Sequence, residues 1–512
     1  MNQSSRKILK YILGILYFLM KYAYKVARIV IEPIARSHPK LRDFEISVRD
    51  AFKDLIRPAN TGSPQSQPQV LFEVFREVVS EHKTEEEIPG WLLDEWKEIH
   101  AVEPEIFPDR WLVKTVPFYQ VPPSRVGEHY LELCQSFKGN TSHVFLVPWL
   151  KTGGADLVVI NYIHALMRGK LSHGISVIST LKADSPWADR LPKEANYIEF
   201  GKRFDHLSED EQEKLLTRVL LQLAPKVIHN INSDLGYRIL VKYGKAMSKF
   251  SSLFVCSFCE EISEEGKLVG YPFQYLSECF DHLEGIFSDN LTFLNKLHDI
   301  YAFDRQKLHV HYQPTLLIPR KQAISNKPAK KARLDVLWAG RIDRQKRPDL
   351  LARIAEKCGD LPITFHVYGS SVMDMHDYTA AFSMLNNVDY HGAFNGLCSL
   401  PTDQYDLFLY TSQWDGLPNV LLEAITLGLP VIASNVGGIS ELIVHGKTGF
   451  LIDPFDDVDS YRNCLERICL DRAILTDAIN NASELIGRRH SWEVLIETLK
   501  NIPAYTVSAS EH

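Results

Sequence analysis

The sequence lacks a long apolar run near its N-terminus. The uncharged apolar stretch there, Tyr11–Met20, has ten residues, whereas a helix that spans a bilayer needs about 20. The stretch resembles the apolar core of a signal peptide, but the apolar pattern continues past Lys21 and no cleavage site of small residues is clear. We therefore expect neither a spanning helix nor a secretory leader in this segment.

Cysteine is also scarce, with eight residues in 512. Several lie in apolar runs such as "LFVCSFC", and the one C-x-x-C pair, Cys256 and Cys259, has neither a second pair nearby nor an evident redox context. In a chain of this size the pattern indicates buried free thiols in a reducing compartment. We expect no metal site, and we interpret the acid-x-acid triplet in "DDVDS" (456–460) as the start of a surface helix.

Positive charge is in the minority overall, with a formal charge of −7, but the first 50 residues are basic. They hold ten Lys or Arg against four acids, a net of +6, which leaves −13 on the other 462 residues.

Five of these cations fall within an arc of roughly 60° on a helical wheel; they are Lys7, Lys10, Lys21, Lys25 and Arg28. Residues 1–56 therefore predict an amphipathic helical anchor on an anionic membrane surface, at the cytoplasmic face of the plasma membrane. The alternative is a helix packed on the next domain with its lysines in water. Nucleic acid is not an expected partner.

Composition and periodicity divide the rest of the chain into four parts. The polar stretch "RPANTGSPQSQPQ" begins a linker and helical extension, 57–139. Short apolar runs that alternate with helical stretches then predict two doubly wound α/β domains, over 140–330 and 331–489, followed by a helix and tail, 490–512. Ligands bind such sheets beyond the carboxyl ends of the strands. We therefore expect the active site in the cleft between the two domains.

The stretch "SQWDGLPNVLLEAITLGLPVIAS" (412–434) holds two carboxylates, Asp415 in a loop and Glu423 in an apolar helix. Pro418 suits the first turn of that helix, so free N–H groups near its start can donate to anionic or hydroxyl oxygens. A buried carboxylate is costly without partners. Glu423 therefore either pairs with a neighbouring Lys or Arg or accepts hydrogen bonds from two ligand hydroxyls, as on a ribose. The residues alone leave these two interpretations even.

A basic loop, "WAGRIDRQKRPDLL" (338–351), follows the first strand of the second α/β series. Its cations are Arg341, Arg344, Lys346 and Arg347. Cations beside a helix N-terminus suit phosphates, although a basic loop alone is more often a solvated surface. With a carboxylate able to bind hydroxyls in the same half of the chain, a nucleoside diphosphate becomes the better interpretation.

Several motifs resemble the retaining glycosyltransferases of family 4, which have the GT-B fold. They are "AGRIDRQKRPDLL", "HVYGS" (366–370), "VDYHGAF" (388–394) and the long block "SQWDGLPNVLLEAITLGLPVIASNVGGISELIVHGKTGFLIDP" (412–454). In the first half, "VPWLKTGGADLVVINYIHALMRGKLSHGISVIST" resembles the family's glycine-rich loop, helix and second strand, and "HSWEVLIETLKNIPAY" (490–505) its late helix. The resemblance covers about 140–505 and implies two Rossmann-like domains that face a cleft.

The resemblance implies roles for the charged residues of the second domain. Arg341 and Lys346 would hold the diphosphate of a nucleotide-sugar donor. Glu423 would bind the ribose hydroxyls. Asp415 would occupy the first acidic position of the family's E-x7-E motif and face the donor sugar, so that Asp415, Arg341 and Lys346 would act in catalysis.

Backbone positions and one aromatic residue complete the expected substrate site. The segment Gly416, Leu417, Pro418, Asn419 and Val420 would contact sugar or phosphate oxygens through its backbone N–H groups, of which Pro418 has none. Gly153 and Gly154 would let the loop of the first domain approach the phosphates, where a side chain would collide. Residues near Tyr390 would lie against the nucleobase.

Two departures from the family pattern bear on catalysis. The first acid of the motif is usually Glu, and Asp415 is one methylene shorter. Many members carry a His after a middle strand of the first domain, where this chain reads "FVCSFCEE"; His229 lies on an earlier strand and is interpreted as structural. We name no catalytic base. A retaining reaction in which the leaving phosphate assists the acceptor on the same face needs none.

The sequence thus predicts an enzyme that moves a sugar from a nucleotide sugar to a hydroxyl of a glycan or lipid-linked acceptor with retention, in the synthesis of an envelope polysaccharide such as lipopolysaccharide. It would need no metal or cofactor. One alternative is another GT-B enzyme, such as a nucleotide-sugar epimerase or a phosphorylase. The other is a catalytically inactive GT-B scaffold, which the two departures keep open.

Overall fold

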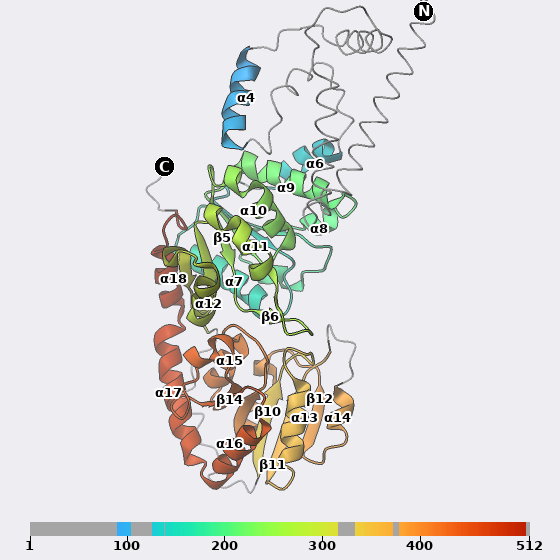
Figure 1. The fold of residues 1–512 in the computed structure, drawn as a ribbon, viewed down its shortest axis with the longest axis vertical. Helices are drawn as coiled ribbons and strands as arrows, with labels where there is room; N and C mark the ends of the chain where they lie inside the picture. The colour runs from blue at the N-terminus through green and yellow to red at the C-terminus, as the bar shows by residue number, and fades with distance from the viewer. Residues whose placement is uncertain (1–89, 104–124, 138, 316–332, 372–377, 508–512) are drawn as a thin grey trace, which may run out of the picture. The chain divides into compact units, whose positions relative to one another are not determined.

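The computed structural model describes residues 90–103, 125–137, 139–315, 333–371 and 378–507. The chain forms two compact units, 1–119 and 120–512. The described part of the first unit is essentially one helix, α4 (Gly90–Val102) (Figure 1). The basic segment 1–56 lies outside the described residues, so its membrane role stays a prediction. None of the described helices has the length and apolarity to cross a membrane.

The second unit begins with a seven-stranded parallel sheet in the order β3-β2-β1-β4-β5-β8-β9. In chain order its strands are β1 (His143–Val147), β2 (Ile175–Ser179), β3 (Asn196–Ile198), β4 (Val227–Ile231), β5 (Ser252–Cys256), β8 (Gly285–Ser288) and β9 (Leu308–Val310). Every residue of β1, β2 and β4 is buried. A parallel sheet covered on both faces requires such continuous apolar runs, which is why the sequence revealed these strands.

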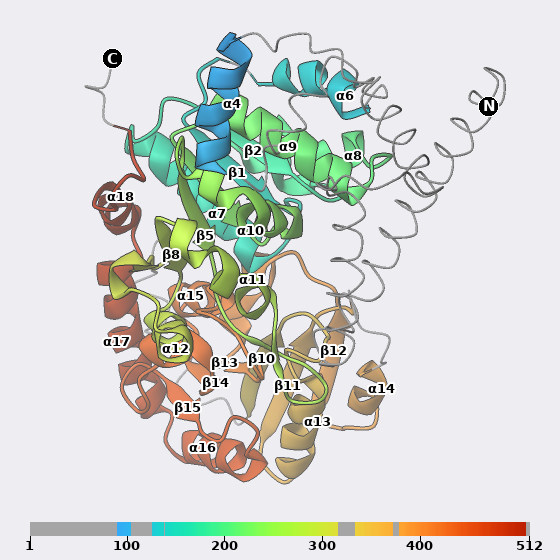
Figure 2. The same cartoon turned by 45° about the horizontal axis from the view of Figure 1, so that its top comes forward.

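Helices cover both faces of this sheet (Figure 2). The helices of this domain are α6 (Arg125–Cys134), α7 (Gly154–Arg168), α8 (Phe200–Arg203), α9 (Glu209–Leu223), α10 (Asp234–Met247), α11 (Tyr271–Cys279) and α12 (Leu291–Tyr301). The hydroxyl of Ser208 and the carboxylate of Glu211 form a capping box that begins α9. Helix α6 packs on α9 and buries Val126 and Leu133. Helix α6 is therefore part of the first domain. The sequence analysis had placed the start of this domain later, at residue 140.

The second domain is a six-stranded parallel sheet in the order β12-β11-β10-β13-β14-β15. Its strands are β10 (Leu334–Ala339), β11 (Ile363–Tyr368), β12 (Val388–Gly392), β13 (Leu407–Tyr410), β14 (Val431–Ser434) and β15 (Phe450–Ile452). Its helices are α13 (Pro348–Lys357), α14 (Thr379–Phe382), α15 (Asn419–Thr426), α16 (Val458–Leu470) and α17 (Ala473–Arg489). The triplet in 456–460 begins α16, with Asp457 as its cap, so the predicted helix start is confirmed.

The last helix, α18 (Trp492–Lys500), returns to the first domain. Helix α17 runs along the second domain, and the chain continues from it into α18 (Figure 1). Leu495, Leu499 and Tyr505 belong to the same apolar core as the strands and α7 of the first domain. The backbone carbonyl of Tyr505 lies 2.7 Å from Nε2 of His143. This C-terminal segment therefore joins the two domains.

All eight cysteines lie in the described residues and are free thiols. Cys256, Cys279 and Cys358 are buried, as predicted, whereas Cys134, Cys259, Cys464 and Cys469 are half-buried. Cys398 is exposed, because it lies in the short 3-10 turn η5 (Leu397–Ser399) rather than in a strand or a packed helix face. For this residue the predicted burial is wrong.

Candidate active site

Two loops meet at the carboxyl end of the second sheet. One, 340–347, connects β10 to α13, and the other, 411–418, connects β13 to α15. Strands β10 and β13 are parallel neighbours, so both loops leave the same edge. The backbone N–H of Gln413 donates to the carbonyl of Gln345 at 2.8 Å, and the side-chain amide of Gln345 donates to the carbonyl of Trp414 at 2.9 Å. These bonds join the two loops into one surface.

Lys346 and Asp415 form an ion pair across these loops, with Nζ 2.6 Å from Oδ2. Lys346 Nζ also donates to the hydroxyl of Tyr410 at 2.6 Å, and that hydroxyl donates to the same carboxylate oxygen. Only 15% and 17% of the Lys346 and Asp415 side chains are exposed. Burial, and then the Asp415 carboxylate, raise the pKa of Tyr410, which therefore keeps its proton. Sequence reasoning found the ion-paired residues and missed Tyr410, the last residue of a buried strand.

The other cations of the basic loop point in different directions. Arg341 lies at the rim, where its Nε is 3.0 Å from Oδ2 of Asp343 and 44% of its side chain is exposed. Arg344 donates to the backbone carbonyl of Ile262 in the first domain. Arg347 is turned to Asp349, at 2.8 Å. The two predicted phosphate ligands, Lys346 and Arg341, therefore both lie near Tyr410, and the Arg341 charge opposes the rise in the pKa of that residue.

Glu423 lies in the second turn of α15 and is largely surrounded by protein. Burial raises the pKa of its carboxyl group, and a hydrogen bond from the backbone N–H of Leu397 opposes that rise. Within the described residues no Lys or Arg pairs with Glu423. The salt-bridge interpretation is therefore not supported, and the carboxylate retains acceptor capacity for a ligand.

The N-termini of α7 and α15 face each other from the two domains. Helix α15 begins at Asn419 with Pro418 as its cap residue, one position later than predicted. The side-chain amide of Asn419 donates to the backbone carbonyl of Gly154, the first residue of α7, at 3.4 Å. A Cβ added at Gly153 would lie 2.6 Å from Oδ2 of Asp156. The lack of a side chain at Gly153 therefore leaves space for the carboxylate of Asp156. The approach of this loop to a phosphate stays a prediction.

Tyr390 lies apart from these groups. It is on β12 with 42% of its surface exposed, and its hydroxyl donates to the carbonyl of Gly369 at 2.9 Å. Gly369 follows β11, and its neighbour Tyr368 accepts at 3.0 Å from the N–H of Gly340 at the start of the basic loop. Tyr390 is thus linked to the site through backbone contacts but not brought against the Lys346–Asp415 pair.

Two acids that the sequence analysis missed join the domains beside the site. Asp289 follows β8, is 7% exposed and receives a hydrogen bond from the backbone N–H of Leu417, so this N–H, expected to contact the substrate, is already bonded to the protein. Glu441 ends the short turn η7 (Gly437–Glu441) of the second domain. It accepts from the backbone N–H groups of Leu291 and Thr292, at 3.1 and 2.8 Å, where α12 begins. Helix N-termini favour such carboxylates, but a partner in another domain leaves no local sequence signal.

The loop after β5, where the resemblance would place a His, brings Cys259 close to Asp415 and Asp289. Burial, and then the carboxylates of Asp415 and Asp289, raise the pKa of the Cys259 thiol. His229 on β4 is fully buried, with Nδ1 2.9 Å from the hydroxyl of Tyr505 and Nε2 3.2 Å from Sγ of Cys256. It belongs to the core of the first domain, as interpreted from the sequence.

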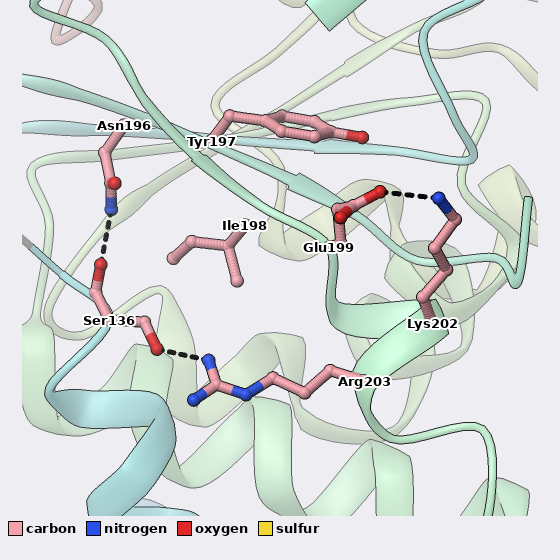
Figure 3. A pocket seen from close by; sticks show the side chains of 7 residues that line it. All are labelled: Ser136, Asn196, Tyr197, Ile198, Glu199, Lys202 and Arg203. Atoms are coloured by element: carbon pink, nitrogen blue, oxygen red, sulfur yellow. Dashed lines mark hydrogen bonds and ion pairs between the residues drawn. The ribbon is translucent and has the colours of Figure 1, made fainter. Parts of the chain in front are cut away.

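A separate cavity of about 460 Å³ lies at the outer edge of the first sheet, between α6, β3 and α8 (Figure 3). Its charged groups pair with one another or with neighbours: Lys202 lies 2.8 Å from Oε1 of Glu199, and Arg203 lies 2.6 Å from Oε1 of Glu132. No residue of the two loops described above lines it. Across the described residues there is no group of three or more His, Cys, Asp or Glu placed to hold a metal ion.

Sequence comparison relates the second domain to sugar-transferring enzymes. Residues 320–485 match the family model of glycosyl transferases group 1. The chain is 31% identical over 155 residues to the O-antigen biosynthesis glycosyltransferase WbnH of Escherichia coli, covering 28% of this chain and 44% of that protein. It is also 31% identical over 185 residues to D-inositol 3-phosphate glycosyltransferase of Arthrobacter sp., covering 34% and 43%. The chain thus spans less than half the length of these curated relatives.

Structural comparison covers both domains. The chain resembles Anabaena Alr3699/HepE, solved in complex with UDP and glucose, with a TM-score of 0.54 at 19% identity, covering 70% of this chain and 98% of that one. It resembles TarM with a TM-score of 0.58 at 13% identity, covering 72% and 99%. At these identities the likeness shows the fold. The protein therefore has the two-domain GT-B fold, and its second domain carries the sequence pattern of glycosyl transferases group 1.

Proposed function

We propose that this protein transfers a sugar from a nucleotide-sugar donor to a hydroxyl of a glycan or lipid-linked acceptor. One observation carries the proposal. Lys346, Asp415 and the α15 N-terminus converge at the carboxyl edge of the second sheet, and Glu423 lies within the same helix without a cationic partner among the described residues. The group 1 match over 320–485 supports the same conclusion, because it includes every one of these residues.

Each part of a nucleotide sugar has a counterpart in this constellation. Lys346 and Arg341 supply positive charge for the diphosphate, with N–H groups at the start of α15. Glu423 accepts hydrogen bonds from the ribose hydroxyls, and Asp415 faces the donor sugar. The loop at Gly153 and Gly154 approaches from the first domain, and the nucleobase lies toward Tyr390.

Transfer occurs with retention of the anomeric configuration. The bond between the sugar C1 and the diphosphate oxygen breaks, and the acceptor oxygen bonds to C1 on the same face. The acceptor proton passes to the leaving phosphate, so no protein base is required. Lys346 and Arg341 stabilise the negative charge that develops on the leaving group, without a divalent metal.

The biological setting is the synthesis of an envelope polysaccharide. Among the proteins with similar sequence are the O-antigen glycosyltransferase WbnH and a UDP-Gal:alpha-D-GlcNAc-diphosphoundecaprenol alpha-1,3-galactosyltransferase of Escherichia coli. The basic segment 1–56 would hold the enzyme on the anionic inner surface of the membrane, beside a lipid-linked acceptor. The donor would then arrive from the cytoplasm.

The test is a thermal-shift and turnover panel with UDP-glucose, UDP-galactose, UDP-N-acetylglucosamine and GDP-mannose. We expect one of them to raise the melting temperature and to be hydrolysed slowly by the purified protein, with release of the nucleoside diphosphate. Binding without any turnover, with or without lipid-linked acceptors, would instead support an inactive scaffold. Interconversion of two nucleotide sugars would indicate an epimerase, and phosphate-dependent cleavage of a glycan a phosphorylase.

A further inference from the structure

The carboxylate of Asp289, in the first domain, lies directly against the loop 411–418 of the second domain. Asp289 follows β8, and a Cβ added at Gly416 would lie 2.7 Å from its Oδ1 and 3.1 Å from its Oδ2. Gly416 is therefore the residue that allows this close approach, because any side chain there would collide with the carboxylate. The next residue, Leu417, donates its backbone N–H to Asp289. Asp289 thus contacts both residues that follow Asp415. Gly416 is also held within the second domain, because its N–H donates to Oδ1 of Asp415 and its carbonyl accepts from the N–H of Gly438, both at 3.0 Å.

Within the part of the chain that the structure describes, no Lys or Arg pairs with Asp289. Its other donor is the side-chain amide of Asn290, 2.7 Å from Oδ1. The charged groups that face it are Asp415 and Glu441; burial first, and then these two acids, raise the pKa of Asp289 to about 7. The nearby Cys259 thiol also has a raised pKa, and Lys346 is paired with Asp415. Burying an acid in this way costs stability, and such costs cluster at functional sites.

Holding the two domains together does not require this acid. Glu441 already joins them through the N–H groups of Leu291 and Thr292, and it accepts from the hydroxyl of Tyr312 at 2.7 Å. These contacts lie where α12 begins, and the turn that carries Glu441 also bonds the Gly416 carbonyl through the N–H of Gly438, at 3.0 Å. The distinctive contact of Asp289 is with the turn at Gly416 and Leu417, beside the acid expected to face the sugar.

We propose that Asp289 is a positioning residue of the donor pocket, which holds the Gly416–Leu417 turn so that Asp415 faces the donor sugar. The inference rests on the proposed function and deepens it. Since Asp289 and Asp415 come from different domains, the sugar end of the pocket is complete only when the domains are engaged. The side chains proposed to hold the diphosphate and ribose, Lys346, Arg341 and Glu423, belong to the second domain, so their contacts do not depend on Asp289.

The experiment compares Asp289→Ala and Asp289→Asn with the wild type and with Asp299→Asn, an exposed acid on the neighbouring helix α12. The ligands are the nucleotide sugar that the wild type turns over in the panel above and its nucleoside diphosphate. At pH 8 we expect Asp289→Ala to lower kcat at least tenfold, while the dissociation constant for the diphosphate changes less than twofold. Asp299→Asn should behave as the wild type.

The pH profile separates positioning from a merely structural role. The ionised carboxylate is the better acceptor for the Leu417 N–H, so the kcat/KM of the wild type should rise through about pH 7. Asn imitates the protonated acid, so Asp289→Asn should stay at the low-pH level of the wild type between pH 6 and 8. An unchanged kcat, an equal loss of affinity for both ligands, or the same pH inflection in Asp289→Asn would overturn the inference. If the wild type turns over no nucleotide sugar, the proposed function itself fails.

Discussion

The amino group of Lys346 lies 2.6 Å from the carboxylate of Asp415, although the two residues are 69 positions apart in the sequence. The pair exists because β10 and β13 are neighbours and their loops are joined by hydrogen bonds. A cation so held is pre-organised for a phosphate, since its side chain has already lost its freedom. It also keeps a negative charge close to the position expected for the donor sugar.

Replacing either predicted phosphate ligand should affect phosphate and nucleoside differently. We expect Lys346→Ala and Arg341→Ala each to weaken the binding of a nucleoside diphosphate more than the binding of the corresponding nucleoside. The difference should be about 1.5–3 kcal/mol, the contribution of a charged hydrogen bond. The loss should be smaller for Arg341, because it is more exposed. Calorimetric titration with both ligands measures the difference.

Arg353→Ala and Lys357→Ala provide matched controls, because both residues are exposed on α13 of the same domain. They should leave both affinities unchanged. Equal losses for the nucleoside and the diphosphate in the Lys346 and Arg341 variants would show that these cations do not touch phosphate.

Activity should not require a divalent metal. Two cations and a helix N-terminus supply the positive field that a leaving diphosphate needs. We therefore expect the rate of transfer or donor hydrolysis to be the same in EDTA as in Mg²⁺ or Mn²⁺. Loss of activity in EDTA with recovery on adding either metal would refute the metal-independent mechanism.

The fold was largely predictable because its strands are continuous apolar runs. "DLFLYTS" became β13 and "PVIAS" became β14, since a sheet covered on both faces needs such runs. Glu423 was found because a lone acid in an apolar helix is costly. In each case a local pattern carries the physical constraint.

The contacts of the site were less predictable, because they depend on residues distant in the sequence. The side chain of Arg344 points to the first domain because it donates a hydrogen bond to the backbone carbonyl of Ile262. Asp289 and Glu441 appear in the sequence as ordinary acids beside a strand or turn. Their roles depend on partners, Leu417 and the start of α12, that only the packing of two domains supplies.

A buried histidine in the first domain should make stability depend on pH. Burial lowers the pKa of His311 to about 3, and no described group hydrogen-bonds to either of its ring nitrogens. The unfolded chain binds this proton near pH 6.5, so the folded state loses stability as pH falls below that value. The His311→Phe variant lacks this group. Below pH 6 its free energy of unfolding should therefore rise relative to that of the wild type by about 1.4 kcal/mol for each pH unit.

Denaturant unfolding of both proteins at pH 5, 6 and 8 measures this difference. Other groups, including His143, whose pKa burial lowers to about 4, and Asp156, whose pKa burial raises to about 6, titrate in both proteins and cancel in the comparison. Stability curves that remain parallel from pH 8 to pH 5 would contradict the assignment.

The basic N-terminal segment should bind anionic membranes. Each cation near the surface contributes about 1 kcal/mol, so full-length protein should co-sediment with phosphatidylglycerol vesicles and not with phosphatidylcholine vesicles. Protein that begins near residue 50 should remain in the supernatant, and so should full-length protein with Lys7, Lys10, Lys21, Lys25 and Arg28 changed to Gln. A shortened protein that pellets equally well would rule out this anchor.

The measurement that tests the donor site most directly is calorimetric titration of Glu423→Gln with the nucleotide sugar selected by the panel. The substitution preserves shape and removes the carboxylate, and Glu356→Gln on the exposed face of α13 is the matched control. Loss of a charged hydrogen bond worth about 1.5–3 kcal/mol predicts at least a tenfold weaker affinity, with an unchanged melting profile of the free protein and a control that binds as the wild type. Unchanged affinity in Glu423→Gln would contradict the ribose assignment and with it the donor site.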